Sequence, residues 1–198
     1  MQTALTPKRF AKISEVVLKR QKNLTLVLEN IHDPHNVSAI LRSADAVGVG
    51  KVYLIYNTNK FPKIGKFSSA SAKKWVDLIR FKSVENCFEE LKSMKYRIYT
   101  TYIENTDKSR TLFDLNLTGR TAIVLGNEHT GVSKEAIELS DVSFNVPMYG
   151  MVQSLNVSVT AAVCLYEALR QRSGKGMYER SQFTKKELRE KLEDYSRR

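Results

Sequence analysis

The sequence is poor in the features that mark secreted and membrane proteins. It has only two cysteines, Cys87 and Cys164, both among apolar residues, so we expect reduced, buried thiols rather than a disulfide. No apolar run approaches the roughly 20 residues that a transmembrane helix needs. The first residues, MQTALTPKRF, lack the apolar core of a signal peptide. These absences favour a cytoplasmic location.

Two common nucleotide-binding patterns are also missing. Neither a GxGxxG fingerprint nor a Walker A sequence is present, which argues against a dinucleotide or nucleoside triphosphate site. No internal repeat or low-complexity tract stands out. A chain of 198 residues with 42% hydrophobic residues is sufficient for one domain with appendages.

The net charge of +11 is concentrated at the two ends of the chain. Residues 1–22 carry six basic side chains and one acidic one, and residues 170–198 carry ten basic and five acidic ones, whereas the middle is nearly neutral. We therefore expect a basic N-terminal helical extension (1–22), a body (23–170) and a charged C-terminal helical extension (171–198). Such segregation favours a polyanionic partner. The alternative is a pair of solvated surface helices.

Hydrophobic periodicity predicts strands alternating with helices. We expect strands at 24–28, 52–55, 76–81, 97–102, 122–125 and 142–146, and helices at 7–22, 35–47, 84–94, 133–139, 155–169 and 184–196, with a loop at 60–74. This order predicts an α/β fold whose mainly parallel sheet is covered by helices on both faces. Ligands of such sheets bind where the strands end, which directs attention to the loops at 101–105, 126–131 and 148–156.

A first group of polar residues lies on the predicted helix 35–47. Asn36 is in its first turn, where the amide can reach across a cleft, and Arg42 is a cation in an otherwise apolar helix that needs an anionic or polar partner. The alternative for Arg42 is a structural ion pair. His32, Asp33 and His35 resemble metal ligands, but no further ligands complete a site, so we expect no metal.

A second group follows the buried strand 122–125. Gly126 there permits close approach of a ligand to the backbone, and Asn127 and Glu128 lie at the mouth of the strand. Glu128 is suited to orient a substrate group or Arg42, and the alternative is an exposed loop acid. Gly131 permits the turn into a helix that Ser133 caps.

A third group combines two environments in residues 146–170. Gln153, Ser154 and Asn156 bring polar groups beside an apolar helix of 155–169 that belongs to a core or an interface. A loop of this kind, with unpaired backbone N–H groups, can present a small polar ligand to the interior. The alternative is a loop that only caps a core helix.

These three groups, in this order, resemble the three motifs of the SpoU class of methyltransferases in the SPOUT superfamily. The matching patterns are N(x5)R, GNE(x2)GVS and PMxGxxxSLNVSVxAA, and they cover residues 24–170. The ends of the chain resemble the TrmH type of tRNA (guanosine-2'-O)-methyltransferase, in which a basic N-terminal helix leads into the first strand through an Arg–Gln pair, here Arg20–Gln21, and a charged helix follows the body.

The resemblance implies a deep trefoil knot near the C-terminus that binds S-adenosylmethionine. It also implies a homodimer with active sites at the interface, and a place for helix 155–169 at the dimer seam. The cofactor loops would be 100–105, 125–128 and 146–156. The cofactor-binding residues implied are Thr100, Thr101, Leu125, Gly126, Asn127, Val146, Met148, Ser154, Leu155 and Asn156.

The reaction implied is methyl transfer to the ribose 2'-hydroxyl of the D-loop guanosine, position 18 of tRNA. The resemblance implies that Arg42 activates the 2'-hydroxyl and that Asn36 holds it in place. Since arginine stays protonated in proteins, we expect Arg42 to orient the ribose and stabilise alkoxide charge, with a phosphate oxygen or water taking the proton. The other catalytic positions implied are Glu128, Ser154 and Asn156, and the tRNA-contacting positions are Arg9, Lys12 and Arg20.

Two alternatives remain from the sequence. One is the same chemistry on ribosomal RNA or on the tRNA anticodon loop. The segment before the first strand is too short for the separate RNA-binding domain of many rRNA enzymes, and the anticodon enzymes lack a C-terminal extension. The other is a non-catalytic RNA-binding module, against which the intact motif residues argue.

Overall fold

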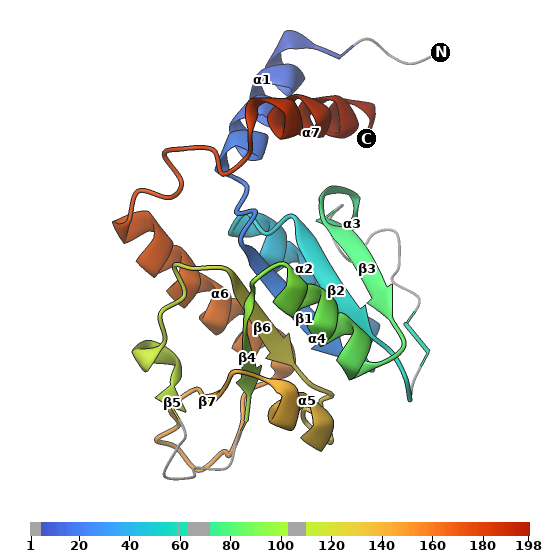
Figure 1. The fold of residues 1–198 in the computed structure, drawn as a ribbon, viewed down its shortest axis with the longest axis vertical. Helices are drawn as coiled ribbons and strands as arrows, with labels where there is room; N and C mark the ends of the chain where they lie inside the picture. Colours follow the sequence, from blue (N-terminus) through green and yellow to red (C-terminus); the bar gives the residue numbers. More distant parts are fainter. Residues whose placement is uncertain (1–4, 59, 63–71, 103–109) are drawn as a thin grey trace.

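The computed structural model describes residues 5–58, 60–62, 72–102 and 110–198. Within them, a seven-stranded sheet has the order β3-β2-β1-β6-β4-β7-β5, and all neighbouring strands pair in parallel (Figure 1). The strands are β1 (Leu24–Glu29), β2 (Lys51–Ile55), β3 (Asp77–Phe81), β4 (Arg97–Thr101), β5 (Arg110–Thr111), β6 (Thr121–Leu125) and β7 (Val142–Asn145). The predicted α/β fold with a mainly parallel sheet is confirmed.

The helices follow the predicted order with shifted ends. They are α1 (Pro7–Lys19), α2 (Pro34–Ala46), α3 (Ala72–Trp75), α4 (Val84–Ser93), α5 (Lys134–Leu139), α6 (Val157–Gly174) and α7 (Lys185–Arg197), with a 3₁₀ turn η1 (Leu112–Asp114). The predicted cap of α5 at Ser133 is confirmed, and Thr184 caps α7. The prediction missed β5, η1 and α3; α3 overlaps the end of the expected loop 60–74, most of which is outside the described residues.

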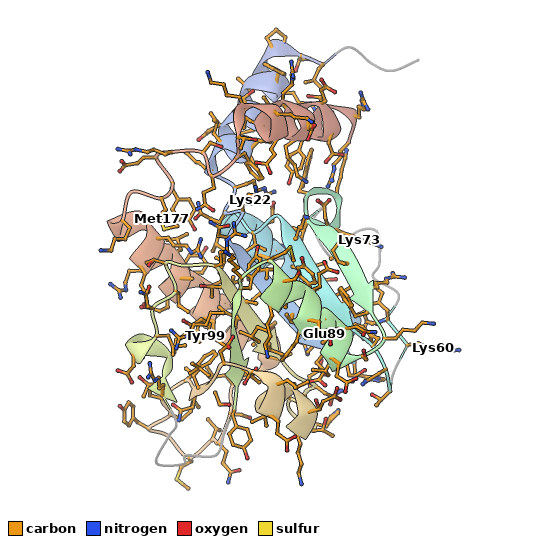
Figure 2. All side chains as sticks on the ribbon, viewed as in Figure 1. Lys22, Lys60, Lys73, Glu89, Tyr99 and Met177 are labelled. Carbon is orange, nitrogen blue, oxygen red and sulfur yellow. The ribbon has the colours of Figure 1, made fainter. Side chains whose placement is uncertain are left out.

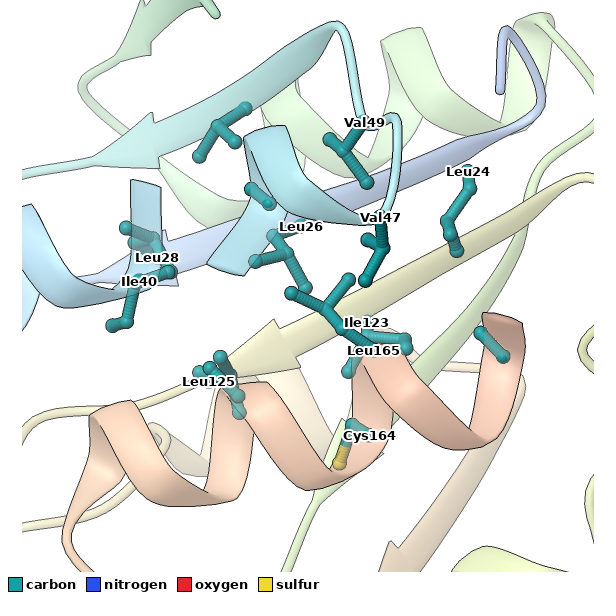
Figure 3. Close-up of a cluster of buried hydrophobic side chains, with 14 of the residues drawn as sticks. Leu24, Leu26, Leu28, Ile40, Val47, Val49, Ile123, Leu125, Cys164 and Leu165 are labelled. Atoms are coloured by element: carbon teal, nitrogen blue, oxygen red, sulfur yellow. The ribbon is translucent and has the colours of Figure 1, made fainter. Parts of the chain in front are cut away.

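Helices cover both faces of the sheet because its central strands are apolar on both sides. In β1, all six residues are buried. Alternate side chains of β1 and β6, including Leu26 and Ile123, pack beneath α2 and α6 (Figure 3). Their neighbours, including Val27 and Val124, pack beneath α4 and α5. Continuous burial of this kind is typical of parallel strands.

The strand order brings the three motif groups to one edge of the sheet. Strand β6 lies between β1 and β4, and β7 follows β4. Because the strands are parallel, the segments that leave β1, β6, β4 and β7 all emerge at the same edge, which we call the carboxyl edge. The opposite edge, where the strands begin, is the amino edge.

The helices from the two ends of the chain pack together at the amino edge (Figure 1). In this terminal pair, Ile13 and Val17 of α1 bury their side chains against Tyr195 of α7. The Asp77 carboxylate, at the start of β3, accepts from Lys191 of α7 at 2.8 Å. Lys22 lies between the pair and the sheet (Figure 2). The expected boundary at residue 170 falls inside α6, which continues to Gly174.

Candidate active site at the carboxyl edge

A chain of side-chain hydrogen bonds joins the three motif groups. The Asn36 amide, in the first turn of α2, donates from Nδ2 to Oε1 of Glu128 at 2.8 Å. Its Oδ1 accepts from Nδ2 of Asn156 at 3.1 Å. Asn156 also caps α6, because its Oδ1 accepts from the Ser158 backbone N–H at 2.8 Å. Asn36 is only 8% exposed, so the amide that joins Glu128 to Asn156 is the buried member of this network.

Glu128 is held as a carboxylate by donors from the start of α2. Besides the Asn36 amide, the backbone N–H groups of His32 and Asp33 donate to it at 3.0 and 3.2 Å. Burial by itself would raise the pKa of Glu128, but these hydrogen bonds outweigh it and the pKa lies below its ordinary value. Glu128 therefore fixes the β1–α2 loop against the loop after β6 and does not bond to Arg42.

The loop after β6 is shaped by contacts with its own backbone. Asn127 and Gly131 exchange two backbone hydrogen bonds of 2.9 Å. A Cβ added at Gly126 would lie 2.2 Å from the carbonyl carbon of Gly131, so glycine is required there by the returning chain. Gly150, by contrast, has open space around its Cβ position. The close approach to Gly126 is therefore made by the chain itself.

Arg42 and Ser154 are exposed, unlike Asn36. Arg42 lies on the solvent side of α2 and forms no hydrogen bond or ion pair with any residue in the described part of the chain. The sequence had suggested that its charge needs an internal partner. Exposure removes that need, because water solvates the guanidinium group. Both side chains are free to meet a bound molecule.

The residues predicted for cofactor binding lie around adjacent strand ends. Thr100 and Thr101 end β4, Leu125 ends the neighbouring β6, and Val146 and Met148 follow β7. Strands β6 and β7 both pair with β4, so these residues share one corner of the carboxyl edge. Leu155 is partly buried before α6. Residues 103–105 of the first predicted loop lie outside the described residues.

Sequence reasoning missed two residues that support this edge. Asn30, directly after β1, has a φ of 52°, a conformation that asparagine tolerates better than most residues. Its backbone oxygen accepts from the Asn127 amide at 2.7 Å. The buried Glu29 accepts from the backbone N–H of Ser133 at 3.0 Å. A polar Glu–Asn pair at the end of an apolar strand was the available signal.

An apolar surface borders the site and continues along α6. Tyr149 and Met151, in the loop before α6, are 99% and 100% exposed. Val152 of the same loop and Val159 and Tyr166 of α6 are also exposed. Exposed aromatic and aliphatic side chains gathered in this way mark a surface that another molecule covers.

The structure divides the three predicted RNA-contacting residues. Arg9 and Lys12 are exposed on α1, and Lys12 pairs with Glu15 at 3.3 Å. Arg20 differs from these two, because its side chain is only 2% exposed. Its guanidinium group donates to Asp45 and to backbone carbonyls, so its charge is paired within the protein.

Other predicted features concern cysteines, metals and membranes. Cys87 and Cys164 are buried free thiols, and burial raises both pKa values to about 12. In the part of the chain that the structure describes, no group of three His, Cys, Asp or Glu side chains is arranged to hold a metal ion. None of the helices within those same ranges has the length and hydropathy to cross a bilayer.

One family model covers most of the chain, including the residues that build this edge. The model of the SpoU rRNA Methylase family matches residues 23–166, from the start of β1 to the middle of α6. The chain belongs to the SpoU methylase family. The three polar groups that meet at the carboxyl edge all lie within the matched segment.

Similar SpoU family members include tRNA-modifying enzymes. The chain is 41% identical over 193 residues to a tRNA (guanosine(18)-2'-O)-methyltransferase of Thermus thermophilus, covering 98% of both chains. It is 39% identical to the protein of the same name from Escherichia coli, covering 88% of this chain and 75% of the relative. The crystal structure of the TrmH/SpoU tRNA modifying enzyme of Aquifex aeolicus has a TM-score of 0.88 at 38% identity, covering 96% and 95% of the two chains.

Proposed function

We propose that this protein methylates the ribose 2'-hydroxyl of guanosine 18 in the D-loop of tRNA, with S-adenosylmethionine as the methyl donor. The observation that carries the proposal is similarity to guanosine-18 enzymes over 98% of the chain, terminal helices included. The terminal helices matter because the family model matches only residues 23–166, and family membership alone does not define the RNA substrate.

The corner formed by β4, β6 and β7 fits the cofactor. The Thr100 hydroxyl at the end of β4 is fully buried and has no hydrogen-bond partner among the described residues, which fits a polar ligand group nearby. Thr100, the loop from Leu125 and the segment from Val146 to Asn156 would hold the cofactor, within the deep trefoil knot that the family resemblance implies. When bound, S-adenosylmethionine supplies an activated methyl group on a sulfonium.

Arg42 is the residue best placed to act on the ribose. It is exposed and has no partner among the described residues, and arginine remains charged at any physiological pH. It would orient the ribose and the adjacent phosphate and stabilise negative charge on the 2'-oxygen. Glu128 is a poor proton acceptor because its pKa is lowered and both its oxygens already accept hydrogen bonds. The proton would pass to a phosphate oxygen or to water.

A second copy of the chain would complete the site. The exposed surface formed by Tyr149, Met151, Val152, Val159 and Tyr166 adjoins Ser154 and Asn156, so a partner that covers it would also close over the open side of the site. We therefore propose a homodimer with α6 at its seam, which would exclude water from the reacting groups.

The terminal pair would bind the RNA backbone. Arg9 and Lys12 of α1 and Lys185, Lys186 and Arg189 of α7 are exposed cations. Within one chain they lie at the amino edge, whereas the corner proposed for the cofactor lies at the carboxyl edge, so an RNA that reaches both must extend past the sheet or past the partner. A folded tRNA is large enough for this. In this view 1–22 and 171–198 are substrate-binding extensions of a catalytic body.

The deciding experiment is methyl transfer from labelled cofactor to unmodified tRNA, followed by mapping of the modified nucleotide. We expect a single 2'-O-methyl group at guanosine 18. The matched control is the same tRNA with 2'-deoxyguanosine at that position, which should accept no methyl group. Methylation of ribosomal RNA or the anticodon loop would support the alternative substrates, and tight RNA binding without transfer would indicate a non-catalytic module.

A further inference from the structure

The side chain of Arg20 connects the terminal pair to the helix that carries Arg42. Its guanidinium group donates to the Asp45 carboxylate at 2.5 Å and to the backbone oxygens of Val49 and Trp75 at 3.1 and 3.3 Å. It also lies 5.5 Å from the centre of the Tyr195 ring of α7. These contacts, together with its burial, keep Arg20 in one position.

Asp45 lies one turn after Arg42 in α2. Residues three apart in a helix are neighbours on its surface, and an arginine and an aspartate at this spacing attract each other. Asp45 is 33% exposed, so Arg42 could reach its carboxylate from the solvent side. In the structure no ion pair joins them, because Asp45 is bonded to Arg20 instead.

We propose that Arg20 is a positioning residue that occupies the Asp45 carboxylate and thereby leaves the Arg42 guanidinium free for the substrate. This inference rests on the proposed function of Arg42. Without Arg20, Asp45 would be a partly buried carboxylate without its partner, which is costly. Arg42 is the cation one turn away that can relieve this cost, and in doing so it would turn away from the ribose.

The inference extends to the terminal pair as a whole. Arg20 stays beside Asp45 only while α7 and the segment before β3 keep Tyr195 and the Trp75 carbonyl in place. The Tyr195 hydroxyl donates to that same carbonyl at 2.6 Å. The helices that would bind RNA at the amino edge thus also determine whether the reactive arginine is available.

The test is a double-mutant cycle on Arg20→Met and Asp45→Asn, with turnover measured at saturating tRNA and cofactor. We expect Arg20→Met to lower kcat about tenfold. Asp45→Asn alone should change kcat by less than about twofold, because asparagine attracts Arg42 only weakly. The double variant should recover most of the lost turnover. The KM for tRNA and the salt dependence of tRNA binding should stay at wild-type values throughout.

Two further variants separate positioning from general destabilisation. Glu187→Gln removes the ion pair of α7 with Lys22 at the opposite end of α7 from Tyr195, so it should lower the unfolding midpoint while kcat remains unchanged. If Arg20→Met folds poorly, Arg20→Lys is the variant to measure. It keeps a positive charge near Asp45, so its kcat should lie between those of the wild type and Arg20→Met.

Three results would overturn the proposal. A double variant no more active than Arg20→Met would mean that Arg20 supports the fold only. A shallower salt dependence for Arg20→Met would mean that it contacts RNA, and an equal loss of kcat in Glu187→Gln would mean that any loosening of α7 is sufficient. Failure of the proposed function is a separate result, because then the wild-type protein would not methylate guanosine 18.

Discussion

At the amino edge of the sheet, the buried guanidinium groups of Arg20 and Arg172 bond to oxygens of their own chain, whereas Arg42, in the second half of α2, extends into solvent. Arg172 donates to the backbone oxygens of Leu117, Asn23 and Gly119 at 2.9, 3.1 and 2.6 Å. The amino edge is thus completed within one chain. At the carboxyl edge, no described segment covers the exposed apolar surface, which is consistent with the proposed site that substrate and a second copy complete.

Removing Arg172 should give the largest loss of stability at the completed edge. Burial lowers its pKa to about 10, and Arg172→Met would leave several buried oxygens without donors. We expect a loss of about 3 kcal/mol in the free energy of unfolding, measured by denaturant titration. Arg197→Met in α7 removes the exposed partner of the exposed Glu193 and should cost less than about 1 kcal/mol. Equal losses would contradict the comparison.

Removing the exposed Arg42 should lower turnover and leave stability unchanged. Arg42→Ala takes away an exposed side chain, so the unfolding midpoint should not change. Turnover should fall about 100- to 1,000-fold, as expected for loss of a group that stabilises developing charge. Cofactor affinity, measured by calorimetry, should remain close to wild type. A large loss of cofactor affinity would show that Arg42 belongs to the cofactor site instead.

A charge placed on the apolar surface should separate the two copies. Val159 of α6 and Leu18 of α1 are 46% and 45% exposed, which makes them a matched pair from the two edges. Val159→Glu should weaken dimerisation about tenfold or more and reduce turnover with it, while Leu18→Glu should leave both unchanged. Sedimentation over a concentration series measures the effect. Monomers with full activity would refute a site shared between copies.

The terminal cations should affect RNA affinity but not turnover. Arg9→Ala with Lys12→Ala should reduce the slope of log affinity against log salt by about 1 to 2. Lys73→Ala with Lys82→Ala changes the net charge equally at exposed positions and should leave the slope unchanged. Filter binding of tRNA between low and moderate salt distinguishes the two outcomes.

The smallest expected effect concerns the charge on Glu128. Its folded-state pKa lies below the ordinary value of 4.5, so the charged form stabilises the fold above about that pH, and this contribution is lost as pH falls through the folded-state pKa. Glu128→Gln should therefore be less stable than wild type near neutrality, by on the order of 1 kcal/mol, and the two should converge on acidification. A constant difference at all pH values would contradict this account.

Much of the site was predictable because its residues are close in sequence to strand ends. The positions of Asn36 in a first helical turn, of Glu128 after β6 and of Asn156 before α6 follow from local patterns, and the parallel order predicts that they meet. The pairwise contacts were not predictable. Glu128 was expected to orient a substrate group or Arg42, but it bonds to the Asn36 amide and to two backbone N–H groups.

Local sequence patterns predicted most of the strands and helices, the Ser133 cap of α5 and the three family motifs, because these depend on neighbours within a few residues. Only the tertiary structure decided which arginine is buried and which is exposed. Arg20 and Arg42 both lie among apolar and polar neighbours in sequence, and no local pattern separates them. The difference arises because α7 and the start of β3, distant in sequence, enclose Arg20, while no described segment covers Arg42.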